Sequence, residues 1–147
     1  MSRKSEPPTE AEVLARIAAV PYAAFLGLSF DLAGDEMTAV MPFQELLVGN
    51  PTLPAIHGGV LGAMLEITAL AQIAVARRTA GLAGGVSKPI GVTVEYLRTG
   101  RPRDTFARGS IKRMGRRIAT VHVEAWQEAR DQPVAALHGH FLLPKDG

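Results

Sequence analysis

The chain has 147 residues, a length typical of one domain with a single hydrophobic core. Apolar residues make up 47% of it and charged residues 20%, a composition that excludes wholesale disorder. A net charge of +2 is too small to indicate a polyanionic partner such as nucleic acid, and the absence of cysteine excludes disulfides and thiolate nucleophiles.

The N-terminus precedes the first structural signal. Residues 1–9 are polar and contain prolines, so we expect a flexible segment followed by one domain over 10–147. This segment resembles neither a secretory signal nor a membrane anchor, and a cytoplasmic protein without a membrane partner is expected. Thr9 followed by Glu12 is a capping box, and it predicts a helix over 10–19.

The next elements are a hairpin and a long helix. Apolar residues alternate over 26–33, and after the Gly34-Asp35 turn signal a second strand pattern covers 36–42. Residues 44–56 contain Gly and Pro at several positions and are expected to form a loop. Residues 58–79 are rich in Ala, Leu and Met without alternation, which predicts a helix of about 33 Å.

The second half of the chain is expected to be a sheet. Strand patterns cover 90–98, 105–114, 117–128 and 134–143, and the turns between them are short enough for an antiparallel meander. The central helix is apolar on nearly all sides, so protein must surround it, and a single curled sheet would do so. The predicted fold class is α+β.

One motif stands where the loop becomes the central helix. His57-Gly58-Gly59 places unpaired N–H groups and the positive end of the helix dipole at this point, and glycine leaves room for a ligand carbonyl. Glu66 follows nine residues after His57, on a stripe of small residues. A carboxylate that can serve as base or nucleophile, together with preorganised donors for a carbonyl oxygen, is a combination suited to attack on a carbonyl group.

The order of elements, with Gly49-Asn50, His57-Gly58-Gly59 and the acid at Glu66, resembles the hotdog-fold acyl-CoA thioesterases. The similarity is greatest to the phenylacetate-degradation and 4-hydroxybenzoyl-CoA thioesterase group. It implies an antiparallel sheet wrapped around a long central helix. It also implies a homodimer whose active sites are shared between protomers, with a dimer of dimers as the expected assembly.

The resemblance also implies roles for individual residues. Glu66 would act on the thioester carbonyl carbon, as general base on water or as nucleophile. The Gly58 N–H would polarise the carbonyl oxygen, while Asn50 and His57 would hold the water and orient the thioester. Further substrate contacts are expected from Gly59, Thr68 and Leu70.

Two positions stay open in this comparison. Relatives with Glu as the acid commonly have Thr one turn later, where this chain has Leu70, and Thr68 lies on another face of the helix. Some relatives place a Ser or Thr beyond the helix, for which Ser87 and Thr93 are both candidates.

A basic segment over 98–117 is the expected contact for the phosphates of coenzyme A. It has eight basic residues and one acid, Asp104. The candidates at its predicted turns are Arg101, Arg103, Arg116 and Arg117. No metal and no cofactor are expected, since coenzyme A is part of the substrate and the His residues of the strands provide few ligands.

Two other functions are compatible with parts of this sequence. A non-catalytic acyl-CoA-binding hotdog protein would keep the pocket and the basic segment without turnover. A hotdog hydratase is less favoured, because its Asp-x-Asn-Pro-x-His pattern is absent: Val48 stands at the Asp position and His57 is too far from Pro51.

Overall fold

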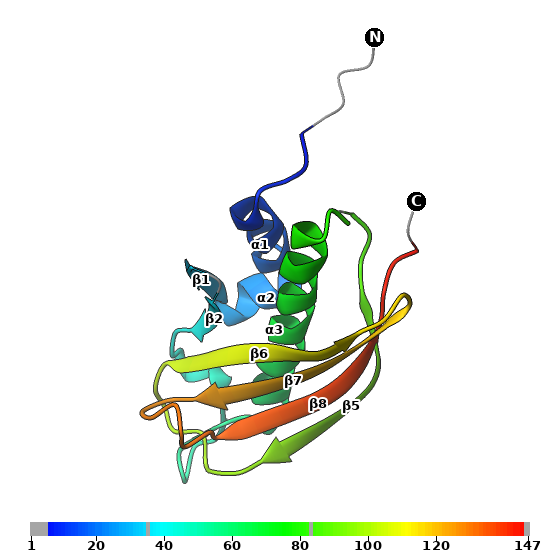
Figure 1. Cartoon of the computed structure of the whole chain (residues 1–147). Coiled ribbons are helices and arrows are strands. Elements are labelled where there is room, and N and C mark those ends of the chain that lie inside the picture. Colours follow the sequence, from blue (N-terminus) through cyan, green and yellow to red (C-terminus); the bar gives the residue numbers. More distant parts are fainter. Residues whose placement is uncertain (1–5, 35, 83, 146–147) are drawn as a thin grey trace.

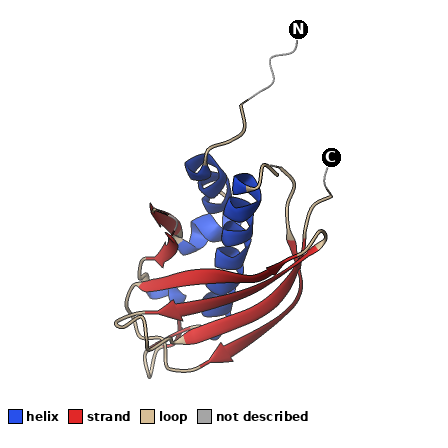
Figure 2. Ribbon diagram, in the orientation of Figure 1, coloured by secondary structure: helices blue, strands red, loops and turns tan. Residues whose placement is uncertain are grey.

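A long helix, α3 (Gly58–Thr79), lies against one face of a curled antiparallel sheet of six strands (Figures 1 and 2). The computed structural model describes residues 6–34, 36–82 and 84–145. The predicted hotdog arrangement, α+β with a sheet wrapped around a central helix, is confirmed. The first five residues of the expected flexible segment lie outside the described residues.

The main sheet has the strand order β1-β2-β6-β7-β8-β5. Its strands are β1 (Ser29–Ala33), β2 (Glu36–Met41), β5 (Lys88–Tyr96), β6 (Thr105–Met114), β7 (Ile118–Trp126) and β8 (Ala135–Leu142). A second, two-stranded ribbon pairs β3 (Val48–Asn50) with β4 (Ala55–Ile56) inside the segment expected to be a loop.

The prediction of a four-strand meander is wrong for its first strand. β6, β7 and β8 follow one another, but β5 pairs with β8 and forms an edge of the sheet. The connection after β5 instead crosses the beginning of α3, where Gly100 O accepts a hydrogen bond from Ile56 N–H at 2.8 Å. A Cβ atom at Gly100 would lie 3.2 Å from Leu61 Cδ1, so glycine permits this close approach.

Two helices precede the sheet. Helix α1 (Glu10–Ala18) begins with the predicted capping box between Thr9 and Glu12. Helix α2 (Pro21–Leu26) was not predicted, and the strand expected from residue 26 begins only at Ser29. It starts with Pro21 at a position that suits proline and ends at Gly27, whose φ of 72° is in the left-handed region.

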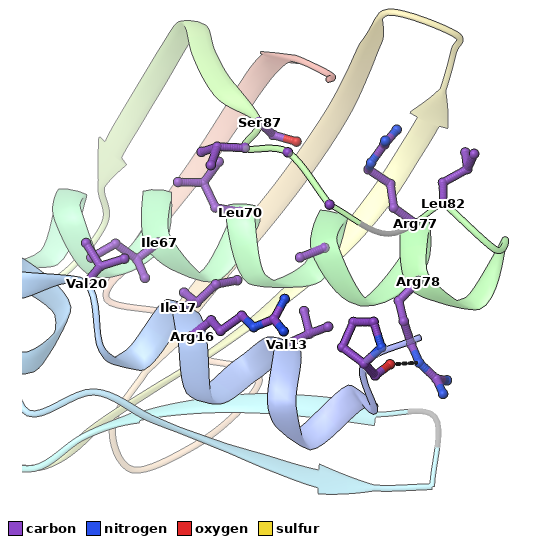
Figure 3. Close-up of a pocket in the computed structure, with 15 residues that line it drawn as sticks. Val13, Arg16, Ile17, Val20, Ile67, Leu70, Arg77, Arg78, Leu82 and Ser87 are labelled. Atoms are coloured by element: carbon purple, nitrogen blue, oxygen red, sulfur yellow. Dashed lines mark hydrogen bonds between the residues drawn. The ribbon is translucent and has the colours of Figure 1, made fainter. Parts of the chain in front are cut away.

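Helix α1 packs on the C-terminal half of α3 (Figure 3). The contact continues into the preceding residues, since Arg78 Nε donates a hydrogen bond to Pro8 O at 2.9 Å. Arg78 also lies 3.7 Å from the Glu10 carboxylate. The described part of the N-terminal segment is therefore attached to the end of the central helix.

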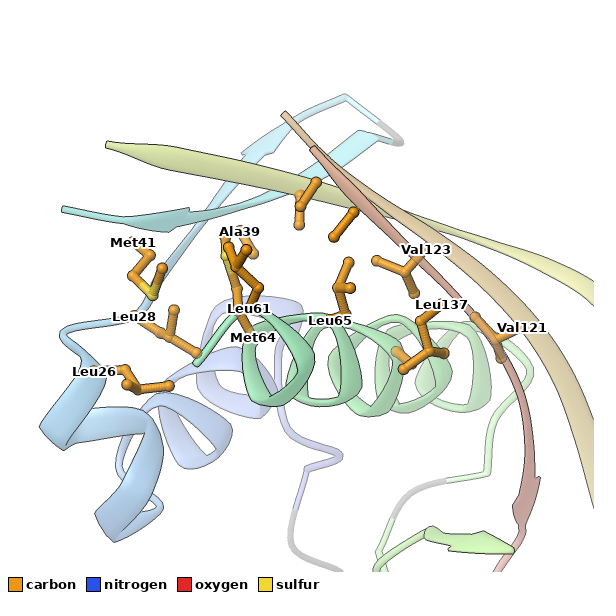
Figure 4. Close-up of a cluster of buried hydrophobic side chains, with 14 of the residues drawn as sticks. Leu26, Leu28, Ala39, Met41, Leu61, Met64, Leu65, Val121, Val123 and Leu137 are labelled. Carbon is orange, nitrogen blue, oxygen red and sulfur yellow. The ribbon is translucent and has the colours of Figure 1, made fainter. Parts of the chain in front are cut away.

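The hydrophobic core lies between α3 and the sheet (Figure 4). Leu61 and Met64 of the helix lie beside Ala39 of β2, and Leu65 lies toward Val123 and Leu137. All of these side chains are almost fully buried. Helix α3 is long and apolar enough to cross a bilayer, but here it is the central helix of the domain. Burying one large aliphatic side chain contributes about 1.5–3 kcal/mol, so this face fixes the helix on the sheet.

Candidate active site

His57 caps the first turn of α3. Its Nδ1 accepts the Gly59 N–H at 2.9 Å, which places the ring proton on Nε2. Its own N–H donates to Leu47 O at 2.9 Å. A Cβ atom at Gly49 would lie only 2.7 Å from the His57 ring, so the absence of a side chain there lets strand β3 pass close beside it. His57 thus has a capping role, and its Nε2–H stays available to a ligand.

Gly58 offers the free donor that the sequence predicted. Among the described residues its N–H has no hydrogen-bond acceptor, whereas the Gly59 N–H is used by His57. Gly58 O accepts the Tyr96 hydroxyl at 2.8 Å, and a Cβ atom at Gly58 would lie 3.2 Å from the Tyr96 ring. No pattern in the sequence marks Tyr96, which is an ordinary strand residue until β5 is placed beside the helix.

Asn50 holds a turn. Its Oδ1 accepts the N–H groups of Thr52 and Leu53 at 3.0 and 3.3 Å. This is an Asx turn, which shapes the β3–β4 connection just before His57. The side-chain amide of Asn50 has no partner among the described residues.

Glu66 is half-buried on the side of α3 that faces away from the core. Within the described chain its carboxylate has neither a hydrogen bond nor an ion pair. Its neighbours on this stripe are small, and Gly62 lies against Val94 and Tyr96 of strand β5. The carboxylate therefore lies beside the exposed edge of the sheet, where a partner can reach it.

Gly58 and Glu66 are too far apart to serve one carbonyl group within a single protomer. Eight residues separate them along α3, which corresponds to about 12 Å along the helix axis. The acid would act on the carbonyl carbon and the N–H would bind the carbonyl oxygen. These two atoms are joined by a single bond, so both groups must lie close to the same point. Within one protomer the donor and the carboxylate therefore cannot act on the same carbonyl group.

The remaining predicted contacts on α3 differ in access. Thr68 is fully buried and donates its hydroxyl to Met64 O at 2.7 Å, so within this chain it has no surface for a ligand. Leu70 is half-buried and lines a cavity together with Ser87. Val94 and Tyr96 both lie against Gly62 of α3, so they point to the helix side of the sheet. Successive residues of a strand point to opposite faces, and Thr93 therefore points away from the helix. Of the two hydroxyl candidates, Ser87 is on the side of Glu66.

The four arginine candidates lie at opposite ends of α3. Arg101 and Arg103 line a cavity of about 430 Å³ near the start of the helix. The backbone of Arg101 is bound on both sides by the Gln127 side chain, and Arg103 pairs with Glu128. The Arg101 guanidinium has no partner among the described residues and is the freer of the two.

Arg116 and Arg117 lie at the other end. Arg116 lines a small cavity of about 130 Å³ with Ala76 and Ala80, which end the central helix. Arg117 is half-buried, and its Nη1 has no hydrogen-bond partner in the described residues. A single phosphate cannot contact both arginine pairs within one protomer.

A cluster of histidines lies on the face of the sheet opposite α3. The rings of His122 and His138 are 4.2 Å apart, and His138 Nε2 lies 3.5 Å from the Glu95 carboxylate. Burial, and next the nearby His138, lower the pKa of His122 below its ordinary value. Among the residues that the structure describes, no group of three or more His, Asp or Glu side chains is placed to hold a metal ion.

The sheet wrapped around a central helix places the chain in the class of hotdog-fold proteins. Residues 53–134 match the family model of the thioesterase superfamily. The match covers more than half of the chain, and the chain belongs to this superfamily. No curated protein matches its sequence.

Solved structures agree with this assignment. A protein of Chromobacterium violaceum is 33% identical, with 89% of each chain covered and a TM-score of 0.69. A phenylacetic acid degradation-related protein of Ralstonia eutropha is 19% identical over 89% of this chain and 98% of its own, with a TM-score of 0.73. A Bacillus halodurans protein solved with CoA is 19% identical over 97% and 99%, with a TM-score of 0.72. The last two show similarity of fold.

Proposed function

We propose that the protein is a cytoplasmic acyl-CoA thioesterase that hydrolyses an acyl-CoA to a free acid and CoA. The observation that carries the proposal is the free Gly58 N–H at the start of α3, on the same helix as the unpaired carboxylate of Glu66. Membership of the thioesterase superfamily and the CoA held by the Bacillus halodurans protein support it. The mechanism uses neither a metal nor a redox cofactor.

Hydrolysis would follow the chemistry that these groups supply. Water attacks the thioester carbonyl carbon while Glu66 takes its proton, and the N–H of Gly58 stabilises the oxyanion that forms. The carbon–sulfur bond then breaks, and the proton held by Glu66 goes to the CoA thiolate. In a nucleophilic variant the Glu66 carboxylate attacks first, the carbon–sulfur bond breaks, and the CoA thiolate leaves and takes a proton from solvent. Water then hydrolyses the resulting anhydride, which releases the free acid and restores the Glu66 carboxylate.

Because Gly58 and Glu66 are about 12 Å apart along α3, the two groups that act on one thioester would come from two protomers. In an edge-to-edge dimer, two antiparallel α3 helices would bring Glu66 of one protomer opposite the helix start of the other. Strand β5 is the exposed edge suited to this pairing, and its residues Val94 and Tyr96 already lie against Gly62 near the middle of the arrangement. A dimer of dimers remains the expected assembly.

The coenzyme A part of the bound substrate would extend out of the site near the start of α3. The loop with Arg98, Arg101 and Arg103 packs there, through Gly100 against Ile56, and contributes positive charge. Phosphate groups bind guanidinium groups well at such exposed positions.

The test of the function is an acyl-CoA panel assayed with a thiol reagent. We expect Glu66→Gln to lower kcat by about 100- to 10,000-fold, the usual contribution of a general base. Asp31→Asn is the control, because Asp31 is exposed on β1, at the edge of the sheet opposite to β5. If wild type hydrolyses no acyl-CoA, or if Glu66→Gln keeps the full rate, the proposal is wrong. Binding without turnover would indicate an acyl-CoA-binding protein instead.

The shared site has its own test. Gly58→Pro removes the N–H, and proline suits this first helical residue because His57 has a ψ of 132°, as residues before proline prefer. The added Cβ atom would lie 3.2 Å from the Tyr96 ring, so that side chain must shift slightly, and circular dichroism verifies that the variant is folded. Each single variant should be inactive. When Glu66→Gln and Gly58→Pro chains are mixed and reassembled, half of the dimers carry one intact site, and about a quarter of the wild-type rate returns. No recovery after mixing would contradict the shared site.

A further inference from the structure

A largely apolar cavity of about 290 Å³ lies between α1, α3 and the segment 84–87 (Figure 3). Val13 and Ile17 of α1 form one wall, and Ile67, Leu70 and Ala74 of α3 form the other. The arginines that also line it, Arg16, Arg77 and Arg78, come from α1 and from the last turns of α3. Aliphatic side chains thus form most of the lining.

The cavity begins one helical turn from the candidate carboxylate. Leu70 follows Glu66 by four residues, so the two side chains are neighbours on the surface of α3, with Cβ atoms about 5–6 Å apart. Leu70 is part of the cavity lining, and Glu66 is not. A group bonded to a carbonyl carbon at Glu66 would reach the cavity by passing Leu70.

The shape of the cavity restricts what fits. Its α3 lining runs from Ile67 to Arg78, which is about 16 Å along the helix. A volume of about 290 Å³ over that length gives a mean cross-section of about 18 Å², as narrow as an extended alkyl chain. A methylene group is similar in size to a water molecule, which occupies about 30 Å³, so the cavity has room for about ten such groups.

We propose that this cavity holds the acyl chain of the substrate, so that the protein selects unbranched aliphatic acyl-CoAs of up to about ten carbons. This inference rests on the proposed thioesterase function. Leu70 lies at the entrance, and Ile17 and Ala74 set the usable length from opposite walls. Helix α1, which lies outside the residues matched by the family model, thereby determines chain-length specificity.

The test is the dependence of kcat/KM on chain length, from acetyl-CoA to palmitoyl-CoA, with phenylacetyl-CoA as an aryl comparison. In wild type each added methylene should raise kcat/KM about fourfold, equivalent to about 0.8 kcal/mol, until the cavity is full near ten carbons. Ala74→Leu adds three carbons to the wall and should lower the ratio of kcat/KM for decanoyl-CoA over butyryl-CoA by about 10- to 60-fold.

Two further variants keep the test decisive. Ile17→Ala enlarges the cavity and should raise the ratio for dodecanoyl-CoA over octanoyl-CoA about fourfold or more. Ala15→Leu makes the same change as Ala74→Leu on an exposed position of α1 outside the cavity, and it should leave both ratios unchanged. Circular dichroism and Tm verify that each variant is folded.

The outcomes separate the two proposals. A wild-type protein without activity on any acyl-CoA refutes the thioesterase function itself. An active wild type that prefers phenylacetyl-CoA to octanoyl-CoA overturns the assignment of the cavity alone. So does an active wild type whose length profile is unchanged by both Ala74→Leu and Ile17→Ala.

Discussion

Replacing Gly49 with alanine tests whether His57 fixes the beginning of the central helix. The new Cβ atom would lie 2.7 Å from His57 Cδ2, 2.8 Å from its Cβ and 2.9 Å from its Cα. Two of these atoms belong to the backbone or are directly attached to it, so rotating a side chain cannot relieve the overlap. Either β3 or the first turn of α3 must move, and the bond from the Gly59 N–H to His57 is then lost.

The size of the effect follows from these two losses. A lost N-cap costs about 1 kcal/mol, and overpacking of a well-packed position typically costs about 1–3 kcal/mol. The expected decrease in the free energy of unfolding is thus about 2–4 kcal/mol. For a domain of this size that corresponds to a decrease in Tm of about 5–15 °C.

The assay is thermal unfolding followed by circular dichroism, with urea unfolding as a second measurement. Gly109→Ala is the matched control, since its Cβ atom would meet Gln72 at an ordinary 3.4 Å. We expect its Tm to change by less than about 2 °C. If Gly49→Ala unfolds at the same temperature as this control, the close contact with His57 does not hold the start of the helix, and the reasoning is refuted.

Three further predictions concern the site and the sheet. Tyr96→Phe removes the hydrogen bond to Gly58 O, at the first residue of α3. It should lower kcat about two- to fivefold, the effect of a partly exposed hydrogen bond, whereas Tyr22→Phe should leave kcat unchanged. Because burial and then His138 lower the pKa of His122 from 6.5, the unfolded chain binds more protons just below that pH. Tm should therefore fall as the pH decreases below 6.5, and His122→Gln should weaken this dependence; equal slopes for both proteins would contradict it. Arg101→Ala should raise KM for acyl-CoA up to about fivefold at low salt, a difference that should disappear in high salt if it reflects phosphate binding.

The helices whose ends are marked by nearby residues, α1 and α3, could be predicted from the sequence. The bounds of α3 agree with the prediction, because Gly58 and the end of the apolar run are both marked in the sequence. The capping box likewise located α1. Helix α2 was missed because a six-residue helix has too few residues to show a period, and its Pro21 start and Gly27 end are its clearest signals. The position of β5 beside β8 depends on a crossing over α3 that turn length cannot reveal.

The candidate site shows the same division. His57 and Gly58 were predicted at the helix start, and the structure adds that one N–H is taken by the His57 ring while the other is free. Asn50 was predicted from a resemblance, and its contacts in the chain are those of a turn. Tyr96 was missed, since its relation to Gly58 spans 38 residues and depends on the packing of β5 against α3.

Strand β5 also bears on how the chain avoids aggregation. Nearly all of its residues are exposed, including Ile90, Val92 and Tyr96, and an edge strand offers free backbone groups to any other strand. Lys88 and Pro89 stand at its beginning, and a charge and a proline at an edge oppose uncontrolled pairing. Until the proposed second copy covers the edge, a newly made chain would thus depend on these two gatekeeper residues to stay soluble.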